Sequence, residues 1–256
     1  MLGQDKLIKK IDTYNISTLP HSILLVGERG SSQYEICDYI SEKFNLPLFD
    51  ITETISDEYL NEIYTSPNLG LYIVNMSKVT EREQNILLKF FEEPNRFTYI
   101  ILICESKHNL LPTIESRSYE LEMETYSYKD LFPLAKEKDL TLKVCTTPGQ
   151  IEVANSTDMP ALFALCKTML EKMNKAAYFN ALTISDKINF KDEYEKYDLY
   201  LFIKVFGYVL LTSESENSLQ MYYKLILFNN KVWPLLNKKQ QFEKFITELW
   251  LLTHGY

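Results

Sequence analysis

Arg117 stands between two serines, Ser116 and Ser118, where the chain changes from helix to strand. A short helical turn is expected over residues 110–114, and residues 119–121 are prone to form a strand, so the arginine is presented on a rigid mount. A guanidinium is planar, permanently charged and able to bind phosphate through two parallel hydrogen bonds. Two interpretations remain open: Arg117 serves a phosphate outside its own chain, or it is a solvated surface residue.

The elements that must position Arg117 alternate between strand and helix. Apolar runs with the length and branched residues of strands lie at 22–26, 48–51, 71–74 and 99–104. Amphipathic helical patterns lie between them, and one of these includes Leu87 and Phe90. Repeated β-α-β order predicts a parallel sheet with helices on both faces. After Leu121 the pattern changes to helices separated by short polar breaks.

Three segments of this region resemble a known family in their order and spacing. They are LPHSILLVGERG at 19–30, LLKFFEEP at 87–94 and LLPTIESRS at 110–118. The chain resembles AAA+ subunits of sliding-clamp loaders, and in particular the bacterial DNA polymerase III delta-prime type. The resemblance implies an α/β fold in three domains. These are an AAA+ parallel-sheet (RecA-like) domain over 1–122, a helical lid domain over 123–157 and an all-helical collar over 158–256.

The collar segment contains more aromatic residues than a single thin layer of helices is expected to bury. Among them are Phe179, Tyr197, Tyr200, Phe202, Phe206 and Trp233. This content predicts that the segment joins other subunits, and packing within its own core is the competing explanation.

In the family that the chain resembles, a Ser-Arg-Cys motif supplies an arginine finger to the ATP site of the neighbouring subunit. Ser116, Arg117 and Ser118 match this motif, with Ser118 in place of the cysteine. The resemblance therefore implies that Arg117 acts in trans within a hetero-oligomer of AAA+ subunits. It also implies a sliding clamp and primer-template DNA as further partners, with ATP and magnesium bound on the partner subunit.

The phosphate-binding loop implied by the resemblance is degenerate. A working loop, G-x-x-x-x-G-K-[ST], uses backbone N–H groups, a Lys and a short hydroxyl to hold phosphates and magnesium. Gly27 and Gly30 keep the turn, but Ser32, Gln33 and Tyr34 occupy the last three motif positions. Gln33 supplies no cation and Tyr34 is a poor substitute for a short hydroxyl, so no cofactor is expected on this chain; the alternative is that the loop holds a nucleotide without hydrolysing it.

Two further positions agree with a lost ATP site. Family ATPases carry adjacent carboxylates after the strand at 71–74, where this chain has Asn75 and Met76. In the lid motif that resembles residues 148–150, active members carry a phosphate-sensing basic residue, and here the candidate is Gln150. The chain is therefore expected to be catalytically inactive itself. It would act only within the ATPase site of a partner.

Composition limits the other possibilities. A formal charge of -8 and a pI of about 5.1 argue against a surface that clamps nucleic acid alone. The four cysteines lack C-x-x-C spacing, which predicts reduced, buried thiols and no metal. The start of the chain lacks a signal-peptide pattern, and the most apolar stretch, 199–211, is short for a membrane span. A cytoplasmic, replisome-associated and possibly virus-encoded protein is expected.

Two alternatives to this reading remain. The chain is a divergent but active ATPase whose missing cations come from elsewhere in the assembly, or it is an interaction scaffold that has kept the fold and left replication. Gln33 is the sequence feature that argues against the first alternative. The second would make Arg117 incidental.

Overall fold

The computed structural model describes residues 2–65, 69–92, 96–107, 110–174, 182–189, 197–232 and 237–254. The chain is organised in two compact units, Met1–Asp130 and Leu131–Tyr256. The domain boundaries expected at residues 122 and 157 stay predictions.

Five parallel strands form the sheet of the first unit, in the order β2-β3-β4-β1-β5. In chain order they are β1 (Ser22–Val26), β2 (Leu48–Asp50), β3 (Gly70–Asn75), β4 (Thr98–Cys104) and β5 (Tyr119–Glu122). Every residue of β4 is buried, as expected for a strand covered on both faces. The predicted parallel sheet is confirmed.

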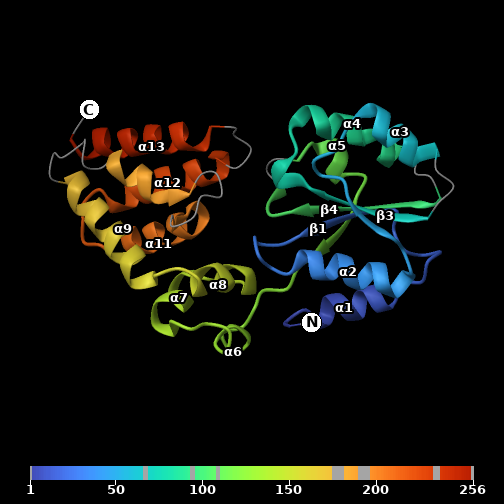
Figure 1. The fold of residues 1–256 in the computed structure, drawn as a ribbon, viewed down its shortest axis with the longest axis horizontal. Coiled ribbons are helices and arrows are strands. Elements are labelled where there is room, and N and C mark those ends of the chain that lie inside the picture. The colour runs from blue at the N-terminus through green and yellow to red at the C-terminus, as the bar shows by residue number, and fades with distance from the viewer. Residues whose placement is uncertain are drawn as a thin grey trace. The chain divides into compact units, whose positions relative to one another are not determined.

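Helices cover both faces of this sheet (Figure 1). One face carries α1 (Asp5–Asp12) and α2 (Gln33–Phe44), and the other carries α3 (Asp57–Thr65), α4 (Glu81–Glu92) and α5 (Pro112–Glu115). A short 3-10 helix, η1 (Met76–Lys78), follows β3. Side chains of a strand alternate between its two faces, so Ile23 and Leu25 join the core under α1 and α2 while Leu24 joins the core under α3 and α4.

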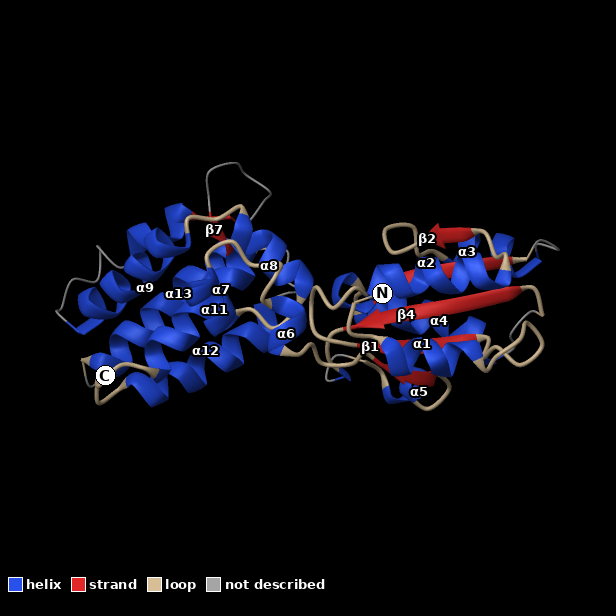
Figure 2. Cartoon of the chain, turned by 90° about the horizontal axis from the view of Figure 1, so that it is seen from below, coloured by secondary structure: helices blue, strands red, loops and turns tan. Residues whose placement is uncertain are grey.

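The second unit is built mainly from helices (Figure 2). They are α7 (Lys138–Val144), α8 (Pro148–Asn155), α9 (Met159–Asn174), α11 (Leu199–Leu211), α12 (Ser218–Val232) and α13 (Lys238–Thr253), with α6 (Tyr128–Leu131) at the unit boundary. A 3-10 helix, η3 (Thr183–Lys187), precedes two paired two-residue strands, β6 (Ile188–Asn189) and β7 (Tyr197–Asp198). Helical periodicity did not predict these two strands.

Aromatic side chains fill the core of the second unit around α11. Phe202 and Phe206 are fully buried and stack with ring centroids 5.7 Å apart, and Phe202 meets Phe242 edge-on at 5.5 Å. Core packing, the competing explanation, therefore accounts for Phe202 and Phe206. Phe179 and Trp233, which the collar prediction also used, lie outside the described residues.

The predicted burial of the four cysteines is confirmed, and none of them forms a disulfide. Burial raises the pKa of Cys104 to about 11 and raises the pKa of Cys37 as well. Within the ranges described above, the structure contains no helix that combines the length and the apolar character needed to cross a membrane.

Candidate functional site

The loop between β1 and α2, where the resemblance implies a degenerate phosphate-binding loop, contains two residues with left-handed backbones. Gly30 and Ser32 both have left-handed backbones, with φ of 80° and 63°. The Gly27 N–H donates to the Cys104 carbonyl at 2.9 Å, which ties the loop to the end of β4. A left-handed backbone costs a non-glycine residue about 1–2 kcal/mol, so Ser32 marks a turn that the surrounding contacts hold in place. The predicted order of strand, loop and helix is confirmed here.

Gln33, at the motif position of the phosphate-binding lysine, turns back into the protein. Its side chain is only 6% exposed, and Nε2 donates to the Leu25 carbonyl at 3.0 Å and to the Cys104 carbonyl at 3.1 Å. The amide therefore joins the carboxyl ends of β1 and β4 beneath the loop. Sequence reasoning predicted the missing cation at this position but not this structural role.

Two side chains from the segment after β5 cover the same loop. A Cβ atom built on Gly27 would lie 2.4 Å from Met123 Cγ, so the methionine packs directly against the loop backbone. Tyr126 Oη donates to the Ser31 carbonyl at 2.9 Å, and burial raises the pKa of this tyrosine. In the described structure Ser31 Oγ is buried and has no hydrogen-bond partner. No sequence motif pointed to Met123 or Tyr126, because their contacts with the loop span about 95 residues of chain.

The N-terminal Gly-Gln pair fixes the segment that carries Met123 and Tyr126. Gln4 is fully buried and exchanges two hydrogen bonds with the backbone of Glu124, at 2.9 and 2.8 Å. Gly3 adopts φ of 63°, and a Cβ there would lie 2.9 Å from the Tyr126 ring. Gly3 and Gln4 therefore hold the segment at 124–126 in place.

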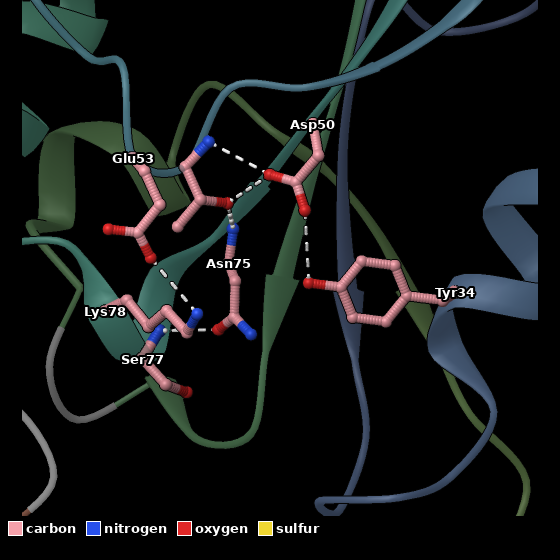
Figure 3. A network of polar contacts seen from close by, with 7 residues as sticks. Tyr34, Asp50, Glu53, Asn75, Ser77 and Lys78 are labelled. Atoms are coloured by element: carbon pink, nitrogen blue, oxygen red, sulfur yellow. Dashed lines mark hydrogen bonds and ion pairs between the residues drawn. The ribbon is translucent and has the colours of Figure 1, made fainter. Parts of the chain in front are cut away.

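A hydrogen-bond network replaces adjacent carboxylates at the carboxyl edge of β2 and β3 (Figure 3). Tyr34 Oη donates to Asp50 Oδ2 at 3.5 Å, while Asp50 Oδ1 accepts from the N–H and the hydroxyl of Thr52 at 3.0 and 2.6 Å. The Thr52 hydroxyl oxygen accepts from the Asn75 N–H at 2.9 Å. Burial raises the pKa of Tyr34. The Met76 side chain is 4% exposed and lies in the core, so it does not face this edge.

A carboxylate that sequence reasoning missed adjoins the phosphate loop. Glu105 directly follows β4, and burial raises its pKa, while the charge of Arg29 in the loop opposes that shift. Glu28, also in the loop, raises the pKa further. Negative charge beside the loop disfavours a bound phosphate.

Arg117 lies on a turn that buried contacts hold in place. Ile114 of α5 is fully buried, and the buried Gln84 of α4 accepts from the Leu111 N–H at 2.9 Å. Arg117 itself is exposed, and its Nη1 donates to the Thr113 carbonyl at 3.2 Å.

The two serines beside Arg117 brace the same turn. Ser118 Oγ donates to the Ile114 carbonyl at 2.8 Å, and Ser116 Oγ donates to the Thr113 carbonyl at 3.2 Å. Their hydroxyls therefore support the backbone on which Arg117 is presented.

Arg117 and the loop after β1 lie at opposite ends of the parallel strands. β1 and β5 run parallel with Ile23 opposite Tyr119, so Arg117 precedes the amino end of β5 while the loop follows the carboxyl end of β1. Gly27 follows Ile23 by four residues, so at about 3.3 Å per residue the start of the loop lies about 13 Å along the strands from the level of Tyr119. The structure therefore does not bring Arg117 together with the loop residues of its own chain.

Gln150, the predicted sensor position, is engaged inside the second unit. It is 6% exposed, its Oε1 accepts from the Thr146 N–H at 3.0 Å, and its Nε2 contacts Tyr200 Oη at 3.4 Å. Its backbone N–H bonds the Thr147 hydroxyl, which caps α8. These contacts account for a glutamine here without a ligand.

The strand order, the loop after β1 and the helices on both faces define an α/β fold of the AAA+ class. A DNA polymerase III gamma subunit-related protein from Thermotoga maritima has a similar fold, with a TM-score of 0.50 and 18% identity over 97% of this chain and 100% of that one. A RuvB mutant from the same organism is similar at a TM-score of 0.48, with 15% identity over 100% of this chain and 90% of that one.

Sequence similarity points within this class to the delta-prime type. Residues 50–127 match the family described as DNA polymerase III, delta subunit. A segment of 63 residues, 23% of this chain, is 40% identical to DNA polymerase III subunit delta' of Buchnera aphidicola subsp. Baizongia pistaciae (strain Bp) and covers 19% of that protein. These matches confirm the resemblance to DNA polymerase III clamp-loader subunits over part of the chain, and the chain spans about a fifth of the length of the delta' relative.

Proposed function

We propose that this chain is a non-hydrolysing subunit of a DNA sliding-clamp loader that lends Arg117 to the ATP site of a neighbouring AAA+ subunit. The observation that carries the proposal is the position of Arg117. Arg117 is exposed on a turn that side-chain hydrogen bonds support, and it lies at the amino end of the strands, whereas the loop of its own chain lies at their carboxyl end. An arginine placed there serves a phosphate held by another molecule more readily than one held by its own chain.

The closed state of the loop supports a non-hydrolysing role. The Gln33 amide binds strand carbonyls rather than a phosphate, and Met123 and Tyr126 contact the loop at Gly27 and Ser31. Tyr34 and Asn75 supply neither a short hydroxyl nor a carboxylate for magnesium. In this proposal ATP and magnesium therefore reside on the partner subunit.

The proposed contribution of Arg117 is electrostatic. Charge builds on the γ-phosphate oxygens as the phosphoryl group transfers, and an arginine inserted from a neighbour neutralises it, which is worth about 10³–10⁵ in rate in P-loop enzymes. The planar fork of the guanidinium binds two phosphate oxygens through parallel hydrogen bonds of fixed geometry, which the rotatable donors of an ammonium group do not provide.

The other proposed partners follow from this role. A loader places a ring-shaped clamp on primer-template DNA, so the clamp and the DNA meet this chain through the assembly. The net charge of -8 agrees with contacts shared among subunits rather than a DNA-binding surface of its own. We place the chain in the cytoplasm with the replisome and propose no membrane partner.

The assembly is tested by purifying the tagged chain from its native host and weighing the intact complex by mass spectrometry. We expect other AAA+ loader subunits in fixed stoichiometry, because a finger residue functions only beside a neighbour's ATP site. Recovery of the chain alone, or with partners unrelated to replication, would support the scaffold alternative.

A second test concerns nucleotide on the isolated chain. Titration calorimetry with magnesium-ATP is expected to show no binding at micromolar concentrations, because Gln33 is tied to strand carbonyls and Met123 covers Gly27. The isolated partner ATPase serves as the positive control. A stoichiometric, magnesium-dependent isotherm would instead favour the divergent ATPase.

A further inference from the structure

Two carboxylates flank the proposed finger along the chain. Glu115 ends α5, two residues before Arg117, and Glu120 lies in β5, three residues after it. Both side chains are partly open to solvent, at 45% and 41% exposure. A guanidinium binds a carboxylate with the same two-pronged geometry that it uses for phosphate. Unless they are neutralised, these carboxylates compete with a neighbour's phosphate for Arg117.

Lys107 binds both of these carboxylates. Its ammonium nitrogen lies 2.8 Å from Glu120 Oε2 and 3.5 Å from Glu115 Oε1. The hydrogen bond to Glu120, followed by the charges of both glutamates, raises the pKa of Lys107, so the lysine stays charged at neutral pH. Lys107 lies between β4 and α5, outside the turn that carries Arg117. This one lysine therefore pairs with the glutamate before Arg117 and with the glutamate after it.

We propose that Lys107 is a positioning residue for Arg117: by binding Glu115 and Glu120, it weakens the attraction of these two carboxylates for the guanidinium and so favours the binding of Arg117 to a phosphate in trans. This inference rests on the proposed function, because it assigns Lys107 a task only if Arg117 acts as a finger. Exposed ion pairs of this kind contribute little to folding stability, so a purely structural role for Lys107 predicts little effect on activity.

The test uses the reconstituted loader and measures steady-state ATP hydrolysis stimulated by clamp and primer-template DNA. Lys107→Met is expected to lower kcat about three- to tenfold while the KM for ATP stays within about twofold, since exposed charge pairs have modest strength. Lys107→Arg keeps the cation and is expected to retain most of the rate. Lys89→Met is the matched control, because Lys89 forms an exposed pair with Asp57 at 2.7 Å on α4 and α3.

Rescue distinguishes a positioning role from a structural one. Removing the competing charges in the triple variant Lys107→Met, Glu115→Gln, Glu120→Gln is expected to restore the rate to within about twofold of the parent. The defect of Lys107→Met should also shrink as salt is raised, because salt screens exposed charges. A triple variant as slow as Lys107→Met, or a single variant at the parental rate, would overturn the inference.

Two controls separate this inference from the proposed function. Light scattering must show the intact assembly for each variant, and if Lys107→Met fails to assemble, Lys107→Gln takes its place in the same comparisons. If Arg117→Ala lowers ATP hydrolysis while Lys107→Met does not, the positioning role of Lys107 is wrong and the proposed role of Arg117 is kept. If Arg117→Ala is itself normal, the proposed function fails first.

Discussion

Arg117→Ala is expected to lower stimulated ATP hydrolysis about 10³-fold at the one site that the arginine faces in the reconstituted loader. The loss arises because the γ-phosphate charge is left without its partner from this subunit. The chain should remain folded and assembled, since an exposed substitution away from buried contacts stays within about 0.5 kcal/mol of neutral. Steady-state ATPase measurements, with light scattering as the assembly check, test both parts.

Two further variants make the result specific to geometry at residue 117. Arg117→Lys is expected to recover little activity, because a point charge on a flexible stem does not reproduce the bidentate fork. Arg82→Ala removes another exposed arginine of the same unit, on α4, and should leave the rate unchanged. A loader with Arg117→Ala that hydrolyses ATP and loads clamps at parental rates would show that Arg117 is an ordinary surface residue.

Local patterns in the sequence were sufficient to predict the sheet. β1 was predicted at its observed bounds, and β4 to within one residue, because uninterrupted branched apolar runs report burial on both faces. The turn before β5 was also predicted, since Arg117 lies between the expected helical turn at 110–114 and the expected strand at 119–121, and the structure has α5 at Pro112–Glu115 and β5 at Tyr119–Glu122. Each of these features depends on residues that are close in sequence.

Long-range contacts explain what the sequence did not predict about the site. Glutamine at position 33 signals a missing cation, but only the fold shows that its amide reaches the carbonyls of both Leu25 and Cys104. Met123 and Tyr126 carry no motif, and they cover the loop because the Gln4 amide fixes the backbone at Glu124. Departures from the nucleotide-binding motif can be identified residue by residue in the sequence, whereas the contacts of Met123 and Tyr126 with the loop depend on the fold.

The aromatic residues of the second unit illustrate a related limit. Composition alone does not separate aromatic residues that build a core from those that meet another subunit, and Phe202 and Phe206 belong to the first group. The pairing of β6 with β7 involves two residues from each strand, which is too short a run for periodicity to detect.

The Gln33 amide provides the second large effect, this time on stability. Gln33→Ala is expected to lower the free energy of unfolding by about 2 kcal/mol, because it removes two buried hydrogen bonds and leaves the Leu25 carbonyl without this donor. The Cys104 carbonyl keeps its bond from the Gly27 N–H, which limits the loss. Urea denaturation measures the change. Tyr34→Phe, which removes a longer bond at an exposed side chain, is the neighbouring control and should change stability by less than about 0.5 kcal/mol.

Gln33→Glu is the sharper variant because it preserves the shape of the side chain and reverses its hydrogen bonding. An ionised carboxylate would face two carbonyl oxygens in a buried site, so we expect a loss of about 3 kcal/mol or more at pH 7. Burial and the facing carbonyls favour the protonated acid, which raises its folded-state pKa above the unfolded value of about 4.3. The deficit relative to the parent should therefore be smallest below about pH 4.3 and grow as pH rises through the folded-state pKa. Parent and variant are compared by urea denaturation at each pH. Equal stability at pH 7 would mean that the residue 33 side chain does not donate to these carbonyls, and the account of the closed loop would be wrong.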